Sequence, residues 1–150
     1  MGDHARVTTG RLAAADRRFL EAFERCDIAA AAFHHPEHLR LAYIYLSLHP
    51  SGAALETMRS GLQRLLAHLG APASKYHETL TAAWLLAVNH FMQMAGPTGS
   101  FDQFAARAGR LFDQRIMQTH YTRELLFSDA ARTGFVEPDL QPIPRYSAVA

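Results

Sequence analysis

The sequence predicts an all-α protein, a bundle of four or five helices followed by an extended C-terminal tail. Three observations predict this fold class: apolar residues recur at helical intervals in successive segments, no segment alternates apolar and polar residues as a half-buried strand does, and Pro or Gly separates the segments. Short connections between amphipathic helices favour antiparallel neighbours. We expect residues 1–150 to form a single helical domain, with a disordered N-terminus at 1–8 and an extended tail at 134–150.

The first helix is expected over 9–26, where apolar residues recur at helical spacing among Arg and Glu. The second is expected to begin near Pro36, because proline is favoured in the first turn, where its missing N–H needs no partner. It is expected to end before Pro50, because the residue that precedes a proline is disfavoured in helical geometry.

The third helix is expected after Ser51, over 53–69, with a leucine-rich stripe and Gly70 as its C-cap. The fourth is expected over 75–95; it is apolar around much of its circumference, which predicts a central position. The fifth is expected over 101–117, and one short helix capped by Ser128 follows it.

The tail beyond that short helix is too apolar for a free linker, and its prolines exclude a continuing helix. Phe135, Val136, Leu140 and Ile143 are spaced along it by prolines and acids. We expect the tail to lie extended across the bundle, with Phe135 and Val136 buried in a groove between helices.

Composition and charge narrow the classes of partner. Fifteen basic and fourteen acidic residues give a formal net charge of +1, which offers no general attraction for nucleic acid or an anionic membrane. Cys26 is the only cysteine, so no intrachain disulfide forms, and the polar N-terminus has no apolar signal region. We expect a cytoplasmic protein with no nucleic acid or membrane partner. A small-molecule substrate and a homodimer stay open.

Three histidines gather at the start of the second predicted helix. His35 and His38 have the i, i+3 spacing that brings two side chains together over one turn. Pro36 leaves an alternative open, in which His34 replaces His35 and pairs with His38 at i, i+4. Imidazole is the commonest metal ligand, so the cluster predicts a metal site that contains His38 in either version.

A third ligand is expected from the fourth helix, where His77 lies in the first turn. Helices two and four are separated by one antiparallel helix and should run roughly parallel, which places His35, His38 and His77 at the same end of the bundle. Three histidines without a fourth protein ligand leave one coordination position open, as in catalytic sites. We therefore expect a metal-dependent enzyme that binds one transition metal ion, copper, iron or zinc, and acts on a small molecule.

Two other functions compete with the metalloenzyme. The first is a non-catalytic helical binding or oligomerisation module, in which the histidines only pack or cap. The second is a pH-responsive protein that uses the histidine cluster as a protonation switch, because imidazole titrates near neutrality.

Three segments resemble a pattern found in a group of small all-helical bacterial proteins that has no assigned biochemical activity. The matching motifs are Phe-x-His-x-x-His-Leu at 33–39, Lys-Tyr-His-Glu-Thr at 75–79 and Phe-Val-Glu-Pro-Asp-Leu at 135–140. Pro36 stands where the pattern has a polar residue. The resemblance implies a helical fold and singles out His35, His38 and His77, but it implies no substrate and no mechanism.

Overall fold

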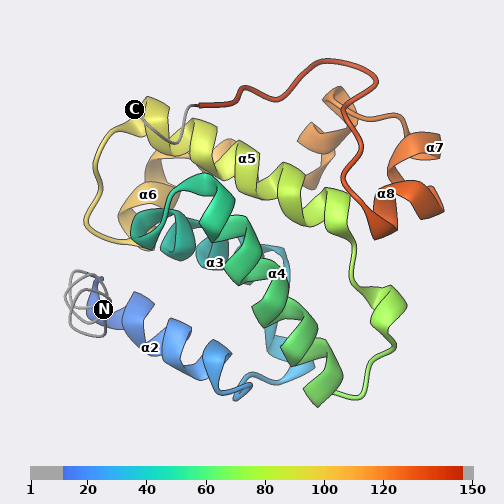
Figure 1. The fold of residues 1–150 in the computed structure, drawn as a ribbon. Helices are drawn as coiled ribbons and strands as arrows, with labels where there is room; N and C mark the ends of the chain where they lie inside the picture. The colour runs from blue at the N-terminus through green and yellow to red at the C-terminus, as the bar shows by residue number, and fades with distance from the viewer. Residues whose placement is uncertain (1–11, 147–150) are drawn as a thin grey trace.

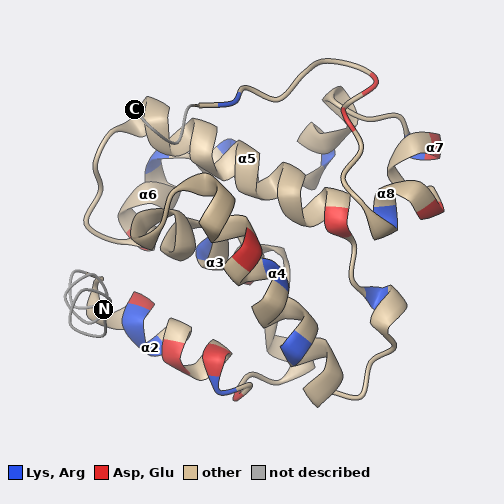
Figure 2. Ribbon diagram, viewed as in Figure 1, with Lys and Arg blue, Asp and Glu red and all other residues tan. Residues whose placement is uncertain are grey.

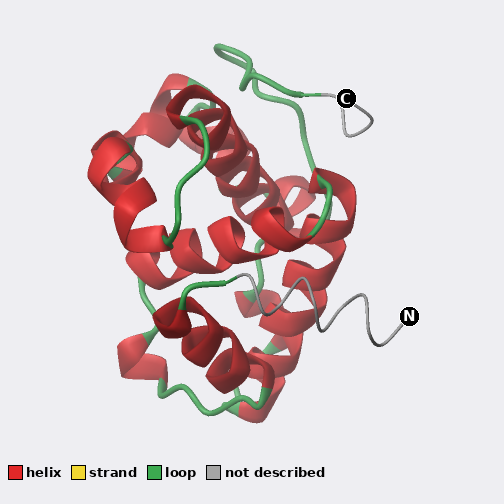
Figure 3. Ribbon diagram, turned by 90° about the vertical axis from the view of Figure 1, so that its left-hand side faces the viewer, coloured by secondary structure: helices red, strands yellow, loops and turns green. Residues whose placement is uncertain are grey.

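The all-α prediction is confirmed by the computed structural model, which describes residues 12–146 (Figure 1). Within this range helices are the only regular secondary structure (Figure 3). The predicted disordered segment 1–8 and the end of the predicted tail lie outside the described residues. The α-helices are α2 (Ala14–Glu24), α3 (His35–Leu48), α4 (Ser51–His68), α5 (Glu78–Ala95), α6 (Phe101–Arg107), α7 (Arg123–Leu126) and α8 (Asp129–Thr133).

Four short 3-10 helices connect the α-helices. They are η1 (Ala30–Ala32), η2 (Ala73–Lys75), η3 (Gly109–Phe112) and η4 (Gln114–Thr119).

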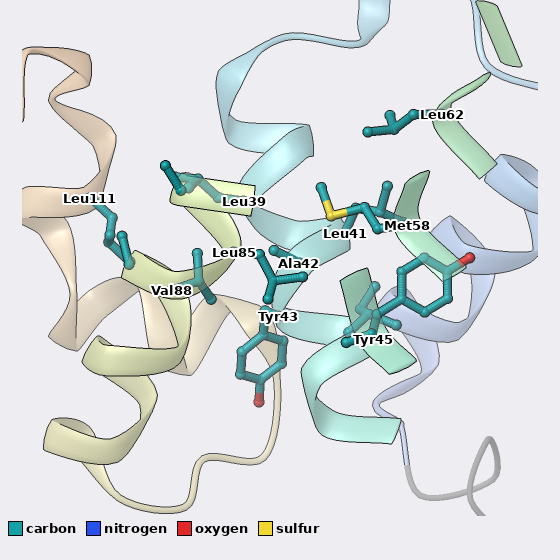
Figure 4. Packing of buried hydrophobic residues seen from close by; sticks show 14 of the residues in the cluster. Leu39, Leu41, Ala42, Tyr43, Tyr45, Met58, Leu62, Leu85, Val88 and Leu111 are labelled. Carbon is teal, nitrogen blue, oxygen red and sulfur yellow. The ribbon is translucent and has the colours of Figure 1, made fainter. Parts of the chain in front are cut away.

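The core is built around α3. Residues 41–45 of this helix are all buried, and its apolar side chains meet those of α4 and α5 (Figure 4). The buried stretch of α3 is covered on all sides by its neighbours, so this helix lies at the centre of the bundle. The helix predicted to be central, α5, packs against α3, α4, α6 and α8. Both α3 and α5 run in the same direction, as the sequence predicted (Figures 1 and 4).

The helix ends follow the predicted stop signals. The second helix begins at His35 with Pro36 in its first turn and ends before Pro50. His34 is its N-cap, and its backbone N–H donates to Glu37 Oε1 at 2.7 Å. Glycines in the left-handed region follow α4 and α5, at Gly70 (φ 74°) and Gly96 (φ 75°), where a side chain would be strained.

The fifth predicted helix was wrong in extent. It ends at Arg107, because Ala108 leaves helical geometry (φ −125°, ψ 38°) and a glycine with low helix propensity follows. The chain continues in η3 and η4, and Leu111 and Met117 still face the core. The apolar periodicity therefore outlasts the α-helix, since a 3-10 helix also places every third residue on one face.

The tail from Gly134 to Tyr146 contains no helix and is tied to the bundle by its backbone. The Thr79 hydroxyl donates to the Gly134 carbonyl (2.9 Å) and accepts from the Val136 N–H (3.1 Å). The Tyr121 hydroxyl donates to the Val136 carbonyl (2.7 Å). Phe135 and Val136 are only partly buried; the most deeply buried tail residue is Ile143, at 4% exposure.

Candidate functional site

His77 is the N-cap of α5, and backbone groups use both of its ring nitrogens. Nδ1 accepts a hydrogen bond from the Leu80 N–H (3.1 Å), and Nε2 donates to the Leu126 carbonyl (2.7 Å). The side chain is 8% exposed, and burial lowers its pKa. In this arrangement His77 links the start of α5 to α7.

His35 and His38 lie close together but make separate contacts. Nε2 of His35 donates to the Leu111 carbonyl (2.9 Å), and its ring packs edge-on against Trp84 (4.4 Å between centroids). The ring of His38 packs against Phe33 (4.5 Å). Burial, and secondly the neighbouring His35, lower the pKa of His38 to about 4, so this imidazole is neutral near pH 7.

The predicted ligands His35, His38 and His77 are not brought together around one point. His35 meets α5 at Trp84, seven residues beyond His77, and seven residues correspond to about 10 Å of helical rise. Across residues 12–146 no group of three or more His, Cys, Asp or Glu side chains is placed to hold a metal ion. The alternative ligand His34 is exposed, and its Nε2 donates to the Ala31 carbonyl (2.6 Å). The three-histidine site stays a prediction.

A cleft of about 610 Å³ lies elsewhere, where α4, η2 and the start of α5 meet α8. Figure 2 shows positive charges of α4 and α8 beside the negative charge that begins α5. Of the charged residues in the cleft, the sequence pointed only to Glu78, which belongs to the Lys-Tyr-His-Glu-Thr motif. The residues that line it are Arg59, Gln63, Ala73, Ser74, Tyr76, Glu78, Asp129, Arg132, Thr133, Gly134 and Phe135.

Glu78 lines the cleft, and an arginine and a tyrosine hold its carboxylate in place. Arg59 donates to both of its carboxylate oxygens, from Nε to Oε1 (2.8 Å) and from Nη2 to Oε2 (2.6 Å), and the Tyr76 hydroxyl also donates to Oε1 (2.7 Å). The Arg59 hydrogen bonds lower the pKa of Glu78, while burial raises the pKa of Tyr76. Glu78 is therefore ionised and Tyr76 protonated near neutral pH, and the charges of Arg59 and Glu78 cancel locally.

Arg132 differs from Arg59, because most of its donors are unused. It lies on α8, which Ser128 caps by accepting from the Ala131 N–H (3.2 Å). Nη1 of Arg132 donates to the Ser74 carbonyl (3.0 Å), whereas Nε and Nη2 have no hydrogen-bond partner among residues 12–146. These two nitrogens form one edge of the guanidinium, the geometry that binds a carboxylate through two parallel hydrogen bonds.

A second cavity of about 340 Å³ lies under the tail and shares Phe135 with the cleft. The Arg145 guanidinium lies over the Phe135 ring, 5.2 Å from its centroid, and pairs with Glu137 (3.0 Å). Apolar side chains dominate the lining, which consists of Leu86, Phe135, Glu137, Pro138, Pro142, Ile143, Pro144 and Arg145.

Two of the three segments singled out by the resemblance contribute to the cleft. Tyr76 and Glu78 come from the Lys-Tyr-His-Glu-Thr segment at 75–79, and Phe135 begins the Phe-Val-Glu-Pro-Asp-Leu segment at 135–140. This shared location was the available signal for the cleft, but His77 was the only predicted ligand in these two segments.

The chain matches no protein family, no curated protein and no solved structure. Within residues 12–146, none of the helices has the length and apolarity needed to cross a bilayer.

Proposed function

We propose that this chain is a binding protein for a small molecule with a carboxylate group, and that Arg132 holds this group in the cleft. The observation that carries the proposal is the Arg132 side chain in the cleft lining, whose Nε and Nη2 have no hydrogen-bond partner within the described residues. Charge-assisted, two-point hydrogen bonding at such an edge is strong and specific for planar anions.

The size and charge of the cleft support a ligand with a single negative charge. A volume of about 610 Å³ falls in the usual range for small-molecule sites. The lining contains two basic residues and two acidic ones, so it has no net charge to attract a dianion. These four residues are Arg59, Arg132, Glu78 and Asp129. Because Arg59 is already engaged by Glu78, a monoanion finds its partner at Arg132.

Butyrate is expected to bind in the cleft and to lose this binding when the guanidinium is removed. Titration followed by amide chemical shifts should move the signals of Ser74 and Gly134, which flank Arg132. R132A should weaken binding by about tenfold or more, because a hydrogen bond to a charged group contributes about 1.5–3 kcal/mol.

The matched control is R123A, which removes an exposed arginine from the neighbouring helix α7 outside the cleft. It should leave butyrate affinity unchanged, and n-butanol should not reproduce the shifts at Ser74 and Gly134. Equal affinities of R132A and R123A for butyrate, or no shifts at these amides, would overturn the proposal.

A metal centre on His35, His38 and His77 is the second candidate, and the chemistry of His38 favours it. A neutral imidazole without a hydrogen-bond partner among the described residues is ready to coordinate a transition metal. The other two do not fit as they stand, because His77 would have to leave both of its backbone partners and His35 would have to leave Leu111. Metal analysis of untagged protein tests this candidate: stoichiometric copper, iron or zinc that H38A and H77A both remove supports it, and substoichiometric metal unaffected by either variant removes it.

For location, we propose the cytoplasm, because the only cysteine cannot form an intrachain disulfide.

A further inference from the structure

We infer that the ligand of the cleft is an unbranched amphipathic carboxylate, a medium-chain fatty acid, whose carboxylate meets Arg132 and whose hydrocarbon chain passes Phe135 into the cavity under the tail. This inference rests on the proposed function and adds the chemical class of the ligand. Its starting point is the pairing of a charged cleft with an apolar cavity across one aromatic side chain.

The second cavity suits a hydrocarbon chain. Leu86 on α5 forms one side of it, and the prolines and Ile143 of the tail form the other. Its two charged residues, Glu137 and Arg145, are paired with each other, so a chain entering the cavity would leave no charge without a partner. Burial of apolar surface from water then favours occupation by methylene groups.

Phe135 lines both cavities, so its ring lies where they come together. The neighbouring tail backbone is fixed at the Gly134 carbonyl and at the Val136 N–H and carbonyl, and none of these hydrogen bonds involves the Phe135 side chain. The ring is partly exposed, and Arg145 packs over it. The inference requires the Phe135 ring to turn aside and join the two cavities, while these hydrogen bonds hold the tail backbone in place.

The expected result is a chain-length dependence of affinity. In a calorimetric series of butyrate, hexanoate and octanoate, each added methylene should tighten binding by up to about fourfold, which corresponds to about 0.8 kcal/mol per buried methylene. Octanol should bind at least about tenfold more weakly than octanoate, because it lacks the charge that Arg132 recognises.

L86F tests the cavity separately from the cleft, because the larger ring fills space under the tail and lies outside the cleft lining. It should bind butyrate like the unmodified chain but lose most of the gain from butyrate to octanoate. The matched control is L69F at an exposed position that lines neither cavity, and it should keep the full gain.

Failure of the inference can be distinguished from failure of the proposed function. If butyrate binds through Arg132 but octanoate binds no more tightly, the inference falls and the proposed function stands. If octanoate binds tightly and R132A has no effect on its affinity, then Arg132 does not hold the carboxylate, and both the proposed function and the inference are wrong. An equal loss of chain-length dependence in L86F and L69F would also overturn the inference, because the effect would then not come from this cavity.

Discussion

Lowering the pH from 7 to 4 is expected to destabilise the fold by about 3 kcal/mol through His38 alone. The folded-state pKa of about 4 lies below the ordinary value of 6.5, so between these limits the unfolded chain binds a proton that the folded chain does not. The stabilisation is fully present above pH 6.5 and is lost as the pH falls toward 4. The pKa of His38 is lowered from 6.5 to about 4, and each unit of this lowering corresponds to about 1.4 kcal/mol of free energy of unfolding.

Urea unfolding of the intact chain and of H38Q at pH 7, 5.5 and 4 measures this contribution. Carboxylates also lose their charge in acid, so the informative quantity is the difference between the two proteins. H38Q should lose less free energy of unfolding than the intact chain over the range, while H68Q, at an exposed position on α4, should follow the intact chain. Identical pH profiles for H38Q and the intact chain would contradict the lowered pKa of this partly buried imidazole.

The fold was largely predictable because its boundaries depend on local chemistry. Pro50 and the glycines at 70 and 96 end helices for reasons that involve only their own backbone geometry. The end of α6 was not predictable in this way, because η3 keeps Leu111 on the apolar face after the α-helix has ended. Periodicity alone does not separate an α-helix from 3-10 turns that continue the same stripe.

The site was less predictable, because it depends on how helices slide and pack. The sequence predicted that α3 and α5 run parallel, but not the axial offset that places His35 beside Trp84 and away from His77. The cleft arises because α8 packs against the start of α5, which brings Arg132 near Glu78 and Arg59. No local pattern marks such a meeting of three segments that lie far apart in sequence.

Removing the Asp16 carboxylate is expected to lower the free energy of unfolding by about 3–5 kcal/mol, as breaking a buried ion pair does. Asp16 lies on α2 with its side chain 2% exposed, and each of its oxygens has a separate task. Oδ1 accepts from Arg40 Nε (3.1 Å), and Oδ2 accepts from the Phe101 N–H at the start of α6 (2.8 Å). D16A would leave a buried backbone donor without a partner and a guanidinium, packed over the Phe101 ring, without its buried counter-ion.

The second ion pair of Arg40 provides the matched control, because its carboxylate is exposed whereas that of Asp16 is buried. Nη2 of Arg40 also donates to Asp102 Oδ1 (3.3 Å), but the Asp102 side chain is 80% exposed. D102A should therefore cost less than about 1 kcal/mol in urea unfolding at pH 7, as exposed pairs do. D16N keeps one oxygen acceptor and should fall between D16A and the intact chain, which keeps the test informative if D16A does not fold. Equal losses for D16A and D102A would mean that burial of Asp16 does not decide the strength of this contact between α2, α3 and α6.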